Sequence, residues 1–176
     1  ANLSSQAEVK RAANEFLALE KPLDILLNNA GIMNRQRTET VDGLEEVFSV
    51  NHLAYFTLSL MLLDKLKQTE NSRVINVASG AHQFVKDMNF DDLQSEKTFK
   101  PLQVYGQSKL ANILFTKSLS EKLLNSGVTV NCLHPGFVST GIGSNNKGIW
   151  NLMMFVAKPF AKKSNKGAET SLYLCS

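Results

Sequence analysis

The sequence predicts an α/β domain in which a parallel sheet is covered by helices on both faces. Three short apolar runs begin near residues 23, 73 and 128, and each has the length of a buried strand. A segment with helical spacing of apolar residues lies in each gap between these runs. Because parallel strands need a long crossover connection, this alternation indicates a βαβαβ arrangement.

Length and composition fit this fold class. The chain has 176 residues, enough for one domain with a substantial core. Apolar residues make up 43% and charged residues 20%, as in soluble globular proteins. The net charge is +3, and the basic residues form no continuous stripe along the sequence. Nucleic acid is therefore not an expected partner. No apolar run approaches the roughly 20 residues of a membrane span, and the N-terminus lacks a signal-peptide layout.

The chain contains two cysteines, Cys132 and Cys175, without metal-ligand spacing. Two isolated thiols indicate structural residues in a reducing compartment, and no metal site is expected. The sequence therefore favours a cytoplasmic location. A membrane-associated location is the alternative if a segment before Ala1 carries an anchor.

The first helix and strand are indicated by their boundary residues. Ser5–Glu8 is a capping box followed by helical spacing, which predicts a helix over 5–19. The apolar run 23–27 follows as a buried strand and ends in Asn28–Gly31. Small residues at this end let the backbone approach a ligand. An ordinary strand-end turn explains the same residues.

A long helix is predicted over 43–67, with a capping box at Asp42–Glu45. At 100° per residue, Asn51 falls in the middle of the apolar face of this helix. A buried amide must find hydrogen-bond partners. Asn51 therefore either ties down a neighbouring loop or holds a water or backbone group in a proton path.

The second strand is predicted over 73–79 and ends in the hydroxyl of Ser79. The connection 80–103 has few periodic signals and is expected to hold one short turn. A helix over 102–125 follows, and its apolar stripe is wider than one sheet face requires. The extra width leaves room for a partner helix, so a homodimer through helices 43–67 and 102–125 is the partner hypothesis.

The third strand, over 128–133, ends in His134-Pro135-Gly136, and a final helix begins near Asn165. The intervening segment is uncharged and rich in aromatic residues and methionine between Ile149 and Ala157. This composition is typical of an apolar flap over a lipophilic pocket. A core-packing helix is the alternative.

Tyr105 and Lys109 are the candidate reactive pair. Residues four apart lie on one face of a helix, which brings the lysine ammonium next to the phenol. A positive neighbour lowers a tyrosine pKa, and a phenol tuned in this way can exchange a proton with an alcohol or alkoxide. A surface Tyr/Lys pair without function has the same spacing.

Five segments in order resemble the short-chain dehydrogenase/reductase family, and the similarity extends over the whole chain. Within the family, the chain is most similar to the retinol-dehydrogenase-like branch. The segments are Asn28-Asn29-Ala30-Gly31, Val50-Asn51-His52, Val77-Ala78-Ser79, Tyr105-Gly106-Gln107-Ser108-Lys109 and His134-Pro135-Gly136.

The resemblance implies a Rossmann-like doubly wound sheet and four catalytic residues. Tyr105 would be the general acid or base, and Lys109 would lower its pKa and hold the nicotinamide ribose. Ser79 would bond the substrate oxygen, and Asn51 would keep a water that relays protons from Lys109. The cofactor would be NAD(P)(H), with NADP slightly favoured. Further cofactor contacts are implied for Asn28, Ala30, Gly31, Pro135, Gly136, Val138 and Thr140.

The chain departs from the family pattern at Ala78, where the family usually has Ser, at Asn2, and at its two ends. Asn2 stands where the family usually places Asp against the adenine, and Asn can accept the same hydrogen bond. The family's first strands, with their glycine-rich phosphate turn, and its last strand have no counterpart here. We therefore expect residues 1–176 to form one partial domain, with three strands of the usual seven. Alone, this chain is expected to be inactive and to expose open sheet edges.

Taken together, these features predict an oxidoreductase that transfers a hydride between NAD(P)(H) and a lipophilic alcohol or carbonyl, such as a retinoid, steroid or aldehyde. One alternative is a catalytically inactive relative that binds a nucleotide or a partner. Another is a tetrapyrrole reductase on the same scaffold.

Overall fold

The computed structural model describes residues 1–136 and 164–176, and within them three parallel strands form one sheet in the order β1-β2-β3. The strands are β1 (Ile25–Asn28), β2 (Arg73–Val77) and β3 (Thr129–Leu133). Their first residues pair across the sheet, so the strands start in register. The predicted α/β class with a parallel sheet is confirmed. All three carboxyl ends meet at one edge.

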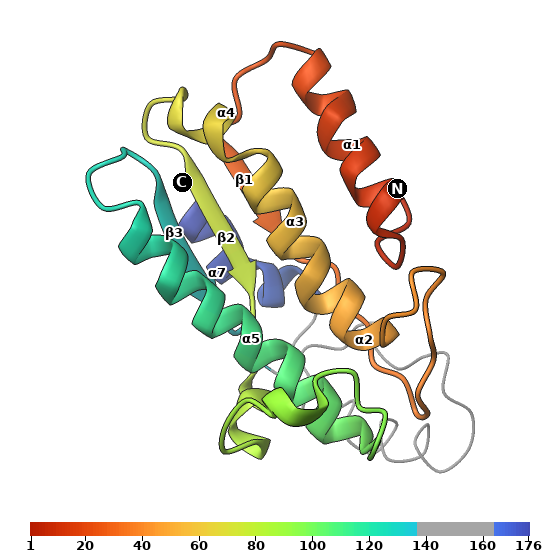
Figure 1. Cartoon of the computed structure of the whole chain (residues 1–176). Coiled ribbons are helices and arrows are strands. Elements are labelled where there is room, and N and C mark those ends of the chain that lie inside the picture. Colours follow the sequence, from red (N-terminus) through yellow and green to blue (C-terminus); the bar gives the residue numbers. More distant parts are fainter. Residues whose placement is uncertain (137–163) are drawn as a thin grey trace.

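Helices cover both faces of this sheet (Figure 1). On one face lies α5 (Pro101–Lys122), beside α3 (Ala54–Met61) and α4 (Leu63–Lys67). On the other face α7 (Ser164–Cys175) packs against β2 and β3. α1 (Gln6–Ala18) packs against α3.

Only half of the predicted capping box at the start of α1 forms, because the Glu8 carboxylate accepts from Arg11 and the Ser5 amide donates to the Asn2 carbonyl. Ser5 adopts an extended backbone conformation, and its hydroxyl accepts a hydrogen bond from the Glu8 amide at 3.5 Å. This contact satisfies one of the free N–H groups of the first helical turn.

The predicted helix over 43–67 is interrupted. It consists of α2 (Glu46–Phe48), a π-helical turn at Ser49–Leu53, and then α3 and α4. The predicted cap at Asp42 is also wrong. The cap is Glu45, whose carboxylate accepts from the amides of Val47 and Phe48 at 2.9 and 2.7 Å. Sequence periodicity did not reveal the π-helical turn, because the contacts that hold it come from other elements of the fold.

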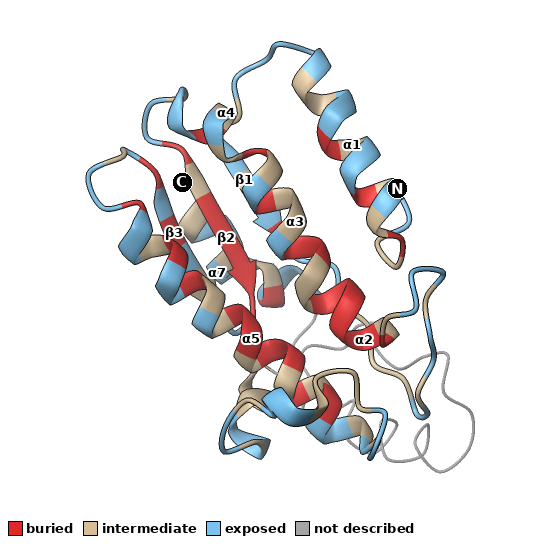
Figure 2. Ribbon diagram, viewed as in Figure 1, coloured by how far each residue is buried: buried red, intermediate tan, exposed pale blue. Residues whose placement is uncertain are grey.

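The core lies between β2, β3 and the helices on their two faces (Figure 2). β2 is the central strand, and its last four residues are buried. The main apolar cluster fills the amino-terminal half of the sheet below α4 and α5. Its buried members are Leu66, Val74, Leu119, Leu123, Val128 and Val130.

The two outer strands are less buried than the sequence predicts. On β1, Ile25 and Leu27 are exposed, and on β3 Thr129 and Asn131 are exposed. Within the described residues each of these strands has one strand neighbour. Their apolar composition indicated full burial, which requires cover on both faces.

The connection between β2 and α5 contains two short 3₁₀ helices, Gly80–Phe84 and Phe90–Asp92, where one short turn was predicted. Among the residues that the structure describes, no helix combines the length and the apolar character needed to cross a bilayer.

Candidate functional site

Lys109 extends from α5 into the protein interior at the carboxyl edge of the sheet. Its side chain is buried, and Nζ donates a hydrogen bond to the carbonyl oxygen of Val77 at 3.0 Å. Nζ also lies 5.6 Å from the ring centroid of Tyr55 and 5.7 Å from that of Tyr105. Burial disfavours the charged form and lowers the pKa of Lys109 to about 8.

Tyr105 and Lys109 meet as the helical spacing predicts, but the direction of the pKa shift was predicted wrongly. Burial raises the pKa of Tyr105, and the hydrogen bond from the Ser79 side chain lowers it by less. The ammonium of Lys109 is directed to the Val77 carbonyl and lies over the phenol ring. Desolvation is therefore the largest influence on the pKa of Tyr105 in this structure.

Ser79 follows β2 and begins the 3₁₀ helix Gly80–Phe84, where its hydroxyl accepts from the Ala81 amide at 3.2 Å. His134 fixes the same turn from the end of β3. Its Nδ1 accepts from the Gly80 amide at 3.1 Å, and its ring lies against the Gly80 Cα. The sequence motif included His134 without a role. The structure shows that it ties the Ser79 turn to the neighbouring strand.

Asn51 lies in the π-helical turn and is fully buried. Its Oδ1 accepts from the Ile32 amide at 2.7 Å, and its Nδ2 donates to the Ile32 carbonyl at 2.9 Å. Nδ2 also donates to Ser108 Oγ at 3.0 Å. Of the two roles that sequence analysis left open, the loop-holding role is therefore present.

The residues after β1 converge on Asn51 and Lys109. Asn28 is buried and donates to Asn76 Oδ1 at 2.8 Å, so its amide anchors the strand end. The Ala30 carbonyl accepts from the Tyr55 hydroxyl at 2.7 Å. A Cβ on Gly31 would meet both Asn51 Oδ1 and Lys109 Nζ at 3.4 Å. Sequence analysis did not identify Tyr55 as a residue of the site.

The remaining predicted contacts are only partly described. Pro135 and Gly136 follow β3 at the same sheet edge, and Gly136 has a φ of 83°, which suits glycine. Val138, Thr140 and the proposed flap Ile149–Ala157 lie outside the described residues. Asn2 lies before α1, where its side-chain oxygen accepts from the amide and hydroxyl of Ser4.

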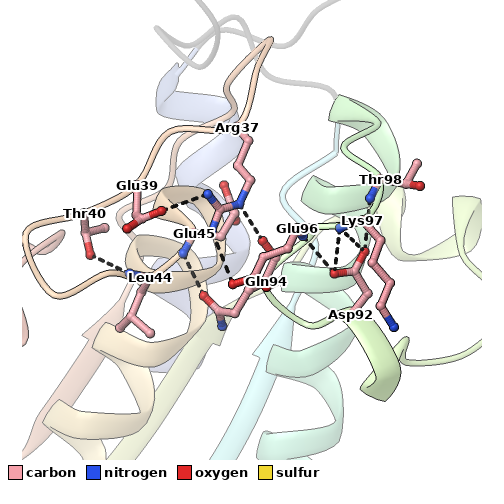
Figure 3. A network of polar contacts seen from close by, with 10 residues as sticks. All are labelled: Arg37, Glu39, Thr40, Leu44, Glu45, Asp92, Gln94, Glu96, Lys97 and Thr98. Carbon is pink, nitrogen blue, oxygen red and sulfur yellow. Dashed lines mark hydrogen bonds and ion pairs between the residues drawn. The ribbon is translucent and has the colours of Figure 1, made fainter.

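A polar network ties the connection 80–100 to the start of α2 (Figure 3). The amide of Glu45 donates to Gln94 Oε1 at 2.7 Å, and Arg37 Nε donates to the Gln94 carbonyl at 2.9 Å. Burial raises the pKa of the Glu45 carboxyl, against two amide hydrogen bonds that lower it. No sequence pattern marks this network, because most of its members lie in loops without periodicity.

A cavity of about 540 Å³ lies between this connection and the first turns of α5. Phe48, Val85 and Val104 are among the residues that line it, but Tyr105 and Ser79 are not. The groups expected to carry the chemistry therefore lie outside this cavity. Among the described residues, no cluster of His, Cys, Asp and Glu has the arrangement of a metal site.

The buried Lys109 predicts an alkaline gain in stability. Its folded pKa of about 8 lies below the ordinary 10.5, so the unfolded chain binds more protons between these values and stability rises with pH. We expect the free energy of unfolding to rise by about 2 kcal/mol from pH 8 to pH 10 through this group. Above about pH 10 the raised pKa values of Tyr55 and Tyr105 act in the opposite direction.

Urea unfolding at several pH values between 7 and 10 measures this effect. Lys109→Met should flatten the rise, whereas Lys117→Met, at an exposed position of α5, should leave it unchanged. Parallel pH profiles for the wild type and Lys109→Met would contradict the assignment.

Comparison with known proteins identifies relatives in one family. Residues 1–148 match the family model described as short chain dehydrogenase. Mouse retinol dehydrogenase 12 is 42% identical over 172 residues, which are 98% of this chain and 54% of that protein. This chain therefore spans about half the length of the curated relatives that it matches.

Solved structures share the fold. The Pseudomonas aeruginosa RhlG/NADP active-site complex matches with a TM-score of 0.63 and 28% identity, over 82% of this chain and 54% of that one. A short chain dehydrogenase from Burkholderia cenocepacia J2315 in complex with NADP matches with a TM-score of 0.75 and 23% identity. The match covers 100% of this chain and 67% of that one. The sheet, the Tyr105–Lys109 pair and the match over residues 1–148 together show that the chain belongs to the short chain dehydrogenase family.

Proposed function

We propose that the protein containing this chain transfers a hydride between NAD(P)(H) and a lipophilic alcohol or carbonyl, with Tyr105 as the general acid or base. The observation that carries the proposal is the convergence of Tyr105, Ser79 and Lys109 at the carboxyl edge of the sheet. Ligands of open α/β sheets bind at this edge. The similarity to retinol dehydrogenase 12 supports a lipophilic alcohol as substrate.

The residues at this edge fit a nicotinamide nucleotide. Gly31 leaves the backbone bare next to Lys109, where a Cβ would reach contact distance of Nζ, at 3.4 Å. An ammonium has three donors, and the bond to Val77 uses one of them, which leaves donors for ribose hydroxyls. When bound, the nucleotide supplies or accepts the hydride. RhlG, a relative named as an NADP complex, supports this cofactor and slightly favours NADP.

The chain itself supplies orientation and the proton. The Ser79 hydroxyl holds the substrate oxygen, and the Tyr105 phenol gives a proton to that oxygen in reduction or takes one in oxidation. Asn51 Oδ1 accepts from Ile32 and has a second lone pair for a water on the path from Lys109 to solvent. In this role the charge of Lys109 also favours the phenolate.

A panel of carbonyl compounds tests the proposed substrate class. We expect retinoid, steroid or long-chain aldehyde substrates to give a higher kcat/KM than small polar sugars, since the uncharged segment Ile149–Ala157 is expected to cover an apolar substrate. Reduction rates followed by NADPH absorbance at matched concentrations measure the preference. A clear preference for sugars would contradict the proposal.

A homodimer through helices 43–67 and 102–125 is the proposed assembly. Phe56, Leu60 and Leu114 are large apolar side chains on these helices, and each is more than 40% exposed. Phe56 and Phe115 contact each other across α3 and α5, so both helices contribute to one outer face. Burial of such a face against its copy would stabilise a symmetric dimer.

Sedimentation of Leu114→Lys tests this assembly. We expect the variant to shift from dimer to monomer, because a charge would have to be buried in the interface. Val41→Lys, at a position that is 85% exposed and outside these helices, is the matched control and should stay dimeric. A wild-type protein that sediments as a monomer at high concentration would exclude the assembly.

A further inference from the structure

The π-helical turn that carries Asn51 is held from outside its own helix. The carbonyl oxygen of Asn51 accepts a hydrogen bond of 2.8 Å from Nδ2 of Asn112 on α5. Asn112 is fully buried, and its side chain thus connects α5 to the turn at the residue proposed to act in the proton path. π-helical turns are rare and depart from regular helix geometry. Here a contact from α5 holds the turn.

The second contact of Asn112 fixes the tautomer of His52. Because the NH₂ group of Asn112 faces the Asn51 carbonyl, its Oδ1 faces His52 Nδ1, at 2.9 Å. An amide oxygen only accepts, so Nδ1 of His52 carries the proton. Burial lowers the pKa of His52, which favours the neutral ring with its hydrogen on Nδ1.

The ring of His52 is itself packed in an aromatic cluster. Its centroid lies 5.2 Å from that of Phe48, 6.3 Å from Phe56 and 6.1 Å from Phe115. These contacts come from both α5 and the helix that contains the turn. These ring contacts hold His52 in the orientation in which its Nδ1 faces Asn112 Oδ1.

Asn112 is anchored on its other side as well. Its backbone carbonyl accepts from Thr116 Oγ1 at 2.7 Å, and Thr116 accepts from Asn76 Nδ2 at 2.9 Å. Asn76 lies in the central strand β2. The contacts thus form a continuous hydrogen-bonded line from the sheet through Asn112 to the turn, in which every side chain except His52 is buried.

The position of the turn determines where Asn51 points. The Asn51 amide pairs with both backbone groups of Ile32, and Asn51 Oδ1 and Lys109 Nζ each lie beside Gly31. A rotation of the turn would break this two-point contact. It would also move the lone pair proposed to hold the relay water.

We propose that His52 and Asn112 are positioning residues, which lock the π-helical turn so that Asn51 faces Gly31, Ile32 and the relay water. This inference rests on the proposed function, since the relay role of Asn51 belongs to it. The hydrogen bond between His52 and Asn112 can be tested without measuring turnover.

The first test reads the hydrogen bond directly. In ¹⁵N-edited NMR spectra of the cofactor-free protein, His52 should show the Nδ1–H tautomer with slow exchange of that proton. In Asn112→Leu, the same proton of His52 should exchange rapidly with solvent. An Nε2–H tautomer in the wild type would overturn the proposal.

The second test separates positioning from stability in the enzyme that contains this chain. His52→Phe keeps a ring in the aromatic cluster and removes the donor. We expect it and Asn112→Leu each to lower kcat by about 10-fold or more, because misplaced catalytic groups are costly, while the KM for NADPH changes less than about 2-fold. The double variant should be no slower than the slower single variant, since both changes break one unit.

Ser72→Ala is the matched control. Ser72 is fully buried and donates to the Leu66 carbonyl at 2.7 Å, at the opposite end of β2. It should lower the melting temperature and leave kcat unchanged. If Asn112→Leu fails to fold, the His52 tautomer and His52→Phe decide the question.

The outcomes distinguish the two claims. Normal kcat in His52→Phe beside an inactive Tyr105→Phe overturns the positioning role alone. Normal kcat in Tyr105→Phe overturns the proposed function itself. Multiplicative losses in the double variant would show two independent effects and would also overturn the inference.

Discussion

Replacement of Tyr105 by Phe is expected to reduce turnover by about 100-fold or more and to leave cofactor affinity nearly unchanged. The substitution keeps the ring over which Lys109 Nζ lies, at 5.7 Å from the centroid, and removes only the phenolic oxygen. General acid–base catalysis typically contributes 10²–10⁴-fold, and no second phenol takes over this role, since the hydroxyl of Tyr55 is bonded to the Ala30 carbonyl.

Stopped-flow reduction of a lipophilic aldehyde, with fluorescence titration of NADPH, measures both quantities. Tyr173→Phe, on the exposed surface of α7, is the matched control and should behave as the wild type. A kcat for Tyr105→Phe within a few-fold of the wild-type value would remove Tyr105 from the mechanism.

Replacement of Lys109 by Met is expected to have two effects. The Kd for the cofactor should rise, because the ammonium proposed to hold the ribose is lost. If hydrogen bonds to the ribose hydroxyls keep Lys109 charged in the cofactor complex, the alkaline limb of the pH–rate profile should also move to higher pH, because the Tyr105 phenolate then loses a positive neighbour.

The two effects can fail separately. A higher Kd with an unchanged alkaline limb would assign Lys109 to binding alone and would show that burial and Ser79 set the Tyr105 pKa. If neither quantity changes, the site has been placed wrongly. Lys117→Met serves again as the control on the same helix.

The fold was predictable because its strongest signals are local. The Ser5 hydroxyl caps the first turn of α1, and residues 73–77 form the central strand, with its last four residues buried. β1 is rich in apolar residues too, yet Ile25 and Leu27 are exposed. Composition indicates the burial that a strand requires, but it does not show which element provides the cover.

The candidate site was predictable where it depends on helical spacing. Tyr105 and Lys109 lie together because they are four residues apart on α5. The pKa of Tyr105 was predicted in the wrong direction, because burial, which comes from tertiary packing, is the largest influence on it. Spacing determines which groups are neighbours, whereas burial determines the direction in which their pKa values shift.

The polar contacts between distant segments could not be predicted. Asn112 and Asn51 are 61 residues apart, and His134 and Gly80 are 54 apart. No local pattern marks such pairs, since each depends on how two elements pack. The π-helical turn at Ser49–Leu53 was missed for a related reason, because the contacts that hold it come from α5 and from the loop after β1.

Deuterium transfer tests the central claim most directly. The full enzyme is incubated with reduced nicotinamide nucleotide that carries deuterium at the transferable position, together with a long-chain aldehyde, and the product is analysed by mass spectrometry. The account predicts an alcohol with one deuterium on the former carbonyl carbon, formed by the wild type and about 100-fold or more slowly by Tyr105→Phe. An alcohol without deuterium, or no alcohol from any lipophilic carbonyl while the enzyme binds the nucleotide, would contradict it.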